Sequence, residues 1–141
     1  MSPRPFAHLL PAEAVLWAAW LAQQGRRAEE FRYDVRVGRG RPVPAGTPEN
    51  IARDWTLLTQ QRIDALEVRD GVPTLYEISP RGSRAAFGAI ELYRDLYRQS
   101  FDYEGPVQLV LVVGEIRPDF FEVAQARGIQ VFIVRPEEEA R

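Results

Sequence analysis

The segment QRIDALEVRDGVPTLYEIS, from Gln61 to Ser79, decides the fold of this 141-residue chain. Asp70-Gly71 within it is a dipeptide typical of two-residue hairpin turns. Short runs rich in apolar residues lie on both sides of this dipeptide, as the strands of a hairpin require. We therefore predict two antiparallel strands, over residues 61–68 and 72–78.

The hairpin places two acidic residues opposite each other. If Arg69 faces Val72 across the turn, the earlier pairs follow in step and Asp64 faces Glu77. Facing side chains project to the same side, with Cβ atoms roughly 4.5–5.5 Å apart. Two like charges at that distance are unfavourable unless a divalent cation, an arginine or a bound proton compensates them.

Pro73 leaves a second interpretation open, because proline removes one donor from the ladder between the strands. A slip of one residue would place Asp64 and Glu77 on opposite faces of the sheet. They would then be separate surface carboxylates with no common site.

The segments around the hairpin complete an α/β pattern. We predict helices over 11–24, 83–100 and 118–127, and one that follows Thr47 as N-cap and ends near residue 60. Strands are expected over 31–37, 107–113 and 130–134, and the last two should be parallel within a βαβ unit. We expect a single domain over 1–135, with a loop at 38–47, and an acidic tail at 136–141.

The first predicted helix carries Trp17 and Trp20 on its apolar face. Such a face normally packs into the core. Two tryptophans on one short helix also indicate a contact with a protein partner or with a second copy of the chain.

The composition narrows the chemistry. The chain has no cysteine and one histidine, so thiolate catalysis and zinc–cysteine sites are excluded. All eighteen basic residues are arginine, which suggests a GC-rich coding bias and a thermophilic source. No apolar run is long enough to span a bilayer. We expect no membrane partner, and a protein located in the cytoplasm or in a particle assembled there.

From Pro11 to Val134, the order of helices and strands resembles that of the PD-(D/E)XK nucleases. The resemblance implies a restriction-endonuclease-like fold: a three-layer α/β/α core in which a mixed central sheet has helices on both faces. It also implies that Asp64 and Glu77 bind Mg²⁺ or Mn²⁺, with Glu13 as a further candidate ligand. Glu91 stands where related nucleases often carry glutamine.

Ser79 stands where the family has a lysine, which orients the attacking water and stabilises the charge that develops on the phosphate. Serine supplies no cation, and the chain has no lysine elsewhere. Arg81 would share the face of Glu77 only if the strand continued past Pro80. Arg84, at the start of the next helix, is the better substitute, although arginine is a poor proton-transfer group.

Three functions remain open at this point. The first is a nuclease-fold protein with little or no cleavage, acting in nucleic-acid-associated binding or in assembly, for example in a phage particle. The second is an active metal-dependent DNA endonuclease, and the third is an unrelated α/β domain with incidental acids. Candidate nucleic-acid contacts are Arg81 and three arginines in or beside the loop, Arg36, Arg39 and Arg41, although a solvated loop would have the same composition.

Overall fold

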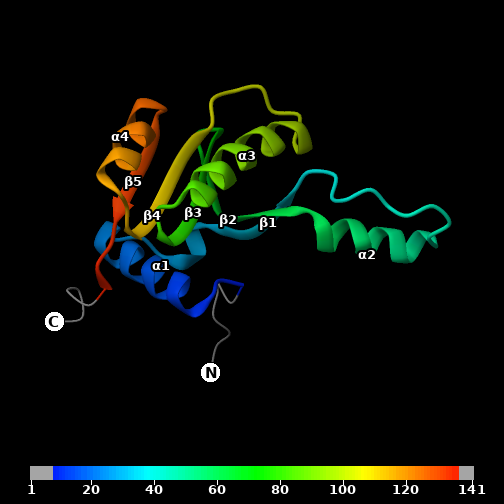
Figure 1. Ribbon diagram of the computed structural model, residues 1–141, viewed down its shortest axis with the longest axis horizontal. Helices are drawn as coiled ribbons and strands as arrows, with labels where there is room; N and C mark the ends of the chain where they lie inside the picture. Colours follow the sequence, from blue (N-terminus) through cyan, green and yellow to red (C-terminus); the bar gives the residue numbers. More distant parts are fainter. Residues whose placement is uncertain (1–7, 137–141) are drawn as a thin grey trace.

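A computed structural model describes residues 8–136 and contains one five-stranded mixed sheet, in the order β1-β2-β3-β4-β5 (Figure 1). The strand β2 pairs antiparallel with β1 and β3, whereas β4 pairs parallel with β3 and β5. The strands are β1 (Arg32–Val37), β2 (Gln61–Arg69), β3 (Val72–Arg81), β4 (Gln108–Glu115) and β5 (Ile129–Ile133). The predicted strands are therefore confirmed, and β3 extends past Pro80 to Arg81.

Helices cover both faces of the sheet and make three layers (Figure 1). One face packs against α1 (Pro11–Gln24), and the other packs against α3 (Arg84–Ser100) and α4 (Pro118–Ala126). Consecutive residues of β4 contribute alternately to the two cores, since Leu111 lies on the α3 side and Val112 on the α1 side. Its nearly continuous apolar sequence is explained by this burial on both faces.

The two tryptophans of α1 belong to the core. Trp17 is fully buried and Trp20 is 3% exposed, and the two rings stack with their centroids 4.9 Å apart. Both rings also meet Tyr76 of β3 edge-on. Because neither ring reaches the surface, the indoles fix α1 on the sheet, as the core-packing interpretation predicts.

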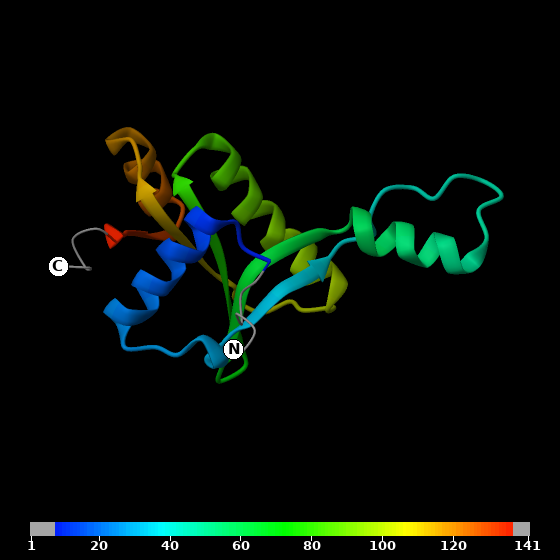
Figure 2. The same ribbon diagram turned by 90° about the horizontal axis from the view of Figure 1, so that it is seen from below.

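The segment between β1 and β2 forms an arm that projects beyond the sheet (Figures 1 and 2). It consists of the loop at 38–47 and α2 (Glu49–Thr59), none of whose residues is buried. The predicted apolar face of this helix, Ile51, Trp55 and Leu58, is exposed. Thr47 is not the N-cap as predicted, because Pro48 takes that position and the Thr47 hydroxyl donates to the Pro44 carbonyl oxygen.

The turn between β2 and β3 has the conformation that its sequence predicts. Asp70 and Gly71 both have positive φ, 52° and 78°, as the two central residues of a type I′ hairpin turn require. Arg69 pairs with Val72, and the ladder continues in step to Ala65 and Tyr76. The register predicted from the sequence is therefore confirmed over this length.

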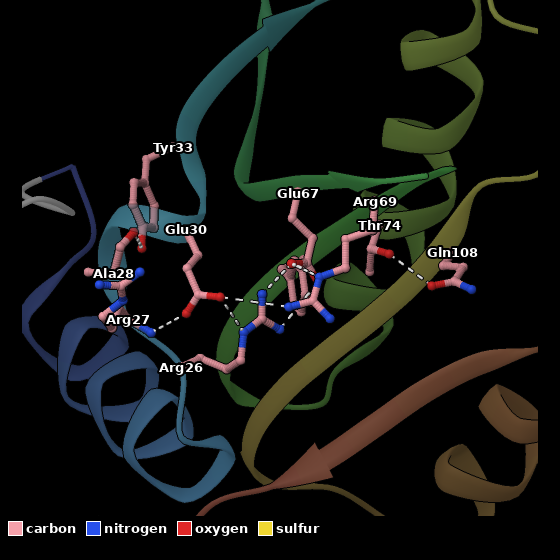
Figure 3. A network of polar contacts seen from close by, with 10 residues as sticks. Arg26, Arg27, Ala28, Glu30, Tyr33, Glu67, Arg69, Thr74 and Gln108 are labelled. Carbon is pink, nitrogen blue, oxygen red and sulfur yellow. Dashed lines mark hydrogen bonds and ion pairs between the residues drawn. The ribbon is translucent and has the colours of Figure 1, made fainter. Parts of the chain in front are cut away.

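A charged network joins the end of α1 to the sheet (Figure 3). Arg26 forms ion pairs with Glu30 and with Glu67, whose side chain is only 9% exposed, and the Tyr76 hydroxyl donates to Glu67 at 2.7 Å. Burial alone would raise the pKa of Glu67, but the hydrogen bonds from Arg26 and Tyr76 outweigh burial and lower it. The network keeps a buried carboxylate charged beneath the aromatic core.

No helix within residues 8–136 is long and apolar enough to cross a membrane. The tail predicted at 136–141 lies outside the described residues apart from Pro136.

Arg26→Ala should destabilise the fold by about 3 kcal/mol, because it leaves the buried Glu67 charge with poor compensation. Arg69→Ala is the matched control, since Arg69 pairs with the same carboxylate from a 63% exposed position. Its loss should cost under about 1 kcal/mol. Urea unfolding measures the free energy of unfolding of both variants. Equal losses of stability would contradict the role of Arg26 as the main counter-ion of Glu67. The Arg26 effect should also shrink as pH falls through the carboxyl range, where Glu67 takes up a proton.

Candidate functional site

The two predicted acids lie just beyond the last backbone pair of the hairpin that joins β2 and β3. The β2–β3 ladder ends at Ala65 and Tyr76, one pair short of Asp64 and Glu77. Instead of a backbone pair, the Asp64 carboxylate accepts a hydrogen bond from the Ile78 N–H at 2.8 Å. A further hydrogen bond joins the Asp64 and Glu77 carboxyl groups. We call these two residues the acid pair.

Asp64 also interrupts the ladder on the other side of β2. The pairing of β1 with β2 skips Asp34 and Asp64, and Asp34 has a positive φ of 55°. The free backbone oxygen of Asp64 accepts a hydrogen bond from His8 Nε2 at 3.0 Å. The local break in both ladders allows the Asp64 carboxylate to turn toward β3.

The acid pair lies in an environment that disfavours negative charge. Burial, the hydrogen bond with Asp64 and the negative charges of Asp64 and Glu13 raise the pKa of Glu77 well above its usual range. Within residues 8–136, no arginine forms an ion pair with either carboxylate. In the absence of a cation, a proton on Glu77 lets the pair form its hydrogen bond.

Two side chains from the helices lie close enough to affect the acid pair. Burial raises the pKa of the Tyr93 hydroxyl, and the charges of Glu77, Asp64 and Glu13 add to that shift. Glu13 of α1 accepts a hydrogen bond from the Leu10 N–H at 3.0 Å, so its carboxylate is already used at the start of that helix. Burial and the charge of Asp64 nevertheless raise the pKa of Glu13.

The acid pair offers the oxygen ligands that Mg²⁺ and Mn²⁺ prefer. Among the residues that the structure describes, no three acidic or imidazole side chains gather as a metal-binding group. Mg²⁺ is commonly held by one or two carboxylates together with waters and substrate phosphates. Two neighbouring carboxylates without a counter-ion therefore fit Mg²⁺ or Mn²⁺. Glu13 does not join them as a third ligand within the described residues.

Ser79 lies two residues beyond Glu77 on β3, where it shares the face of that residue. Its hydroxyl donates a hydrogen bond to the backbone oxygen of Arg81, so it turns toward the end of its own strand. Arg81 continues the same strand and forms an ion pair with Glu115 at 3.5 Å. Arg84 is exposed at the first position of α3 and has no ion pair within the described part of the chain.

The other predicted contacts lie on or beside the arm. Arg36 Nε donates to the Leu57 carbonyl oxygen at 3.2 Å, while the backbone of Arg41 bonds to Thr59 and Trp55. Arg39 and Arg41 line a small hollow of about 210 Å³ at the base of the arm. The structure records no contact between these arginines and the acid pair. Glu91 forms an ion pair at 2.7 Å with Arg127, the residue that follows α4, and this contact directs its carboxylate away from the acid pair.

The positions of His8 and Tyr93 near the acid pair could not be predicted from local sequence patterns. Tyr93 is predicted only as part of the apolar face of α3, and the packing of α3 on the sheet brings it near enough for the charges of the acid pair to raise its pKa. His8 contacts Asp64 across 56 residues of sequence, and no local pattern marks such a contact.

The mixed sheet, with one helix on one face and two on the other, defines a restriction-endonuclease-like α/β fold. A solved structure, a repair endonuclease from Pyrococcus abyssi, is similar to 87% of this chain with a TM-score of 0.50 and 17% sequence identity. The chain spans 47% of the length of that protein. Neither a protein-family model nor a curated protein matches the sequence. The predicted fold class is confirmed by the sheet topology and this structural similarity.

Glu77→Gln should raise the melting temperature at about pH 8 in the presence of EDTA. A raised pKa in the folded state means that Glu77 supports stability at low pH and opposes it as pH rises above the ordinary carboxyl pKa, about 4.3. The gain from glutamine should therefore shrink toward pH 4. Thermal unfolding across this range measures it, with Glu122→Gln as an exposed control. A gain in melting temperature that does not depend on pH would contradict the raised pKa of Glu77.

Proposed function

We propose that this chain is a nuclease-fold protein with a degenerate PD-(D/E)XK site, in which Asp64 and Glu77 hold Mg²⁺ or Mn²⁺ and cleavage is slow or absent. Its role would be nucleic-acid-associated binding or assembly, for example as a component of a phage particle formed in the cytoplasm. The observation that carries the proposal is Ser79, a neutral side chain hydrogen-bonded to its own strand at the position of the family's lysine.

The acid pair supports the metal-binding part of this proposal. Two half-buried carboxylates beside each other raise each other's energy, and no arginine pairs with either of them within residues 8–136. A bound divalent cation would polarise a phosphate and lower the pKa of an attacking water. In that arrangement Asp64 and Glu77 would position the ion, while the Ile78 N–H would orient the Asp64 carboxylate.

The lack of a positively charged side chain at position 79 supports slow cleavage. Phosphodiester hydrolysis places additional negative charge on the phosphate, and preorganised positive groups stabilise it. Ser79 carries no charge, and Arg81 lies at the exposed end of the strand, about 13 Å beyond Glu77 along its length. The acid pair therefore has the means to bind an ion but lacks the usual partner for charge stabilisation.

Arg84 favours the second candidate function, an active metal-dependent DNA endonuclease. Its guanidinium has no ion pair within the described residues and lies just after the strand that carries Glu77. A strand of DNA over the acid pair could be clamped by this arginine. Because arginine stays protonated, it would stabilise charge but would not transfer a proton.

Ser79→Lys should restore the missing cation and increase Mn²⁺-dependent nicking of supercoiled plasmid by roughly tenfold or more over the wild type. The side chain at this position is half-buried at the edge of the site, so a lysine can extend from it. Gel separation of supercoiled and nicked plasmid over time measures the rate.

The control is Asp64→Ala combined with Ser79→Lys, which should return cleavage to background. Fast cleavage by the wild type that disappears in Arg84→Ala would instead establish the second candidate. If Mn²⁺ neither raises the melting temperature of the wild type nor supports cleavage by Ser79→Lys, the metal site itself is refuted.

A further inference from the structure

A groove runs between α3 and α4, beginning where β3 and β4 end. It consists of two hollows of about 510 Å³ and about 360 Å³, which share Arg84 and Phe120 in their walls. The first is closed at its base by Gly82, where a Cβ atom would lie 2.7 Å from Ile116. We call the two hollows together the α3–α4 groove.

The α3–α4 groove is positively charged in a chain whose net charge is −2. Four arginines and two glutamates line it: Arg81, Arg84, Arg117, Arg127, Glu91 and Glu115. Both helices begin at the first hollow, so the positive ends of their dipoles add to the arginine charge. The described structure thus concentrates cations beside the last residues of β3.

Three of these arginines, Arg81, Arg84 and Arg117, are available to an anion. Arg84 has no ion pair within residues 8–136, while the pairs of Arg81 with Glu115 and of Arg117 with Asp119 are at the exposed surface. Exposed pairs of this kind contribute only about 0–1 kcal/mol, so a phosphate can replace the carboxylates. Arg81 lies on the same strand as Glu77, about 13 Å beyond it, so the groove begins on the strand that carries one acid of the pair.

The groove also carries two aromatic rings. Phe87 of α3 and Phe120 of α4 meet edge-on with their centroids 5.9 Å apart, and both line the second hollow. The Arg117 guanidinium lies 4.7 Å from the centre of the Phe120 ring. Arginines beside half-buried aromatic rings are the combination that binds phosphates and stacks unpaired bases.

We propose that the α3–α4 groove binds a single strand of nucleic acid, with phosphates at Arg81, Arg84 and Arg117 and an unpaired base against Phe120. A duplex fits this chemistry less well, because its bases are already stacked on one another. The proposal deepens the proposed function, on which it rests for the expectation that nucleic acid is the ligand. It adds a binding groove separate from the acid pair.

Fluorescence anisotropy with a labelled single-stranded oligothymidylate tests the proposal on the full chain in EDTA. Arg84→Ala should weaken binding about fivefold and reduce the slope of log affinity against log salt by about 0.7. Phe120→Leu should weaken binding about tenfold and leave the salt slope unchanged, because it removes stacking while it preserves apolar volume.

Arg27→Ala is the charge-matched control, since Arg27 is exposed beside α1 on the other side of the sheet. It should bind like the wild type, and an equal loss of affinity in this variant would overturn the groove as the site. Wild-type affinity in both Arg84→Ala and Phe120→Leu would also overturn it.

Competition with inorganic phosphate, thymidine monophosphate and a duplex of equal length identifies the ligand. If the duplex or thymidine monophosphate displaced the labelled oligonucleotide at the same concentration as the unlabelled oligonucleotide does, a site for single strands would be refuted.

Asp64→Ala separates this proposal from the proposed function. If that variant binds the oligonucleotide normally while no variant responds to Mn²⁺, the metal site fails and the groove stands. If Mn²⁺ stabilises the wild type but no oligonucleotide binds, the groove fails and the metal site stands.

Discussion

The register of the β2–β3 hairpin is the constraint on which the rest of the structure depends. Asp70 and Gly71 both adopt left-handed φ values, and the turn they form allows one pairing of the two strands. A shift by one residue would exchange the faces of every side chain in β3. Tyr76 would then leave the aromatic core on the α1 side, and Glu77 would leave the face that it shares with α3. The core packing and the acid pair are consequences of the same two-residue turn.

The parts of the fold that follow from local patterns could be predicted from the sequence. The hairpin register, the buried strand β4 and the limits of α1 are set by turn chemistry and by the period of apolar residues. The bend at Asp64 could not be predicted, since it depends on Asp34 in another strand and on a hydrogen bond to Ile78. The sequence pattern of α2 was equally misleading, because the apolar face of Ile51 and Trp55 indicates burial, yet the helix projects away from the sheet. The pairing at Asp64 and the exposure of α2 depend on contacts between segments far apart in the sequence, and the local pattern of apolar residues carries no information about such contacts.

The distribution of arginine gives the acid pair its unusual character. Arg26 neutralises the buried Glu67 on the α1 side of the sheet, whereas no arginine pairs with Asp64 or Glu77 within residues 8–136. The buried Glu67 and the half-buried Glu77 therefore behave oppositely, since the pKa of Glu67 is lowered and that of Glu77 is raised. A stable protein tolerates the second arrangement when a proton or a metal ion occupies it. Such a site is expensive for folding alone, which is why it indicates a function.

The separation of the acid pair from the α3–α4 groove explains how binding could persist where cleavage is weak. The carboxylates lie on β2 and β3. The aromatic rings of the groove lie on α3 and α4, and its arginines lie at the end of β3, at the start of α3 and at the two ends of α4. Serine in place of lysine at position 79 removes charge from the first location and leaves the second unaltered. A nucleic-acid strand would still gain its phosphate contacts and its stacking energy from the helices, since neither depends on a bound metal. On the proposed function, a single side chain at position 79 would therefore weaken cleavage and leave the proposed binding groove intact.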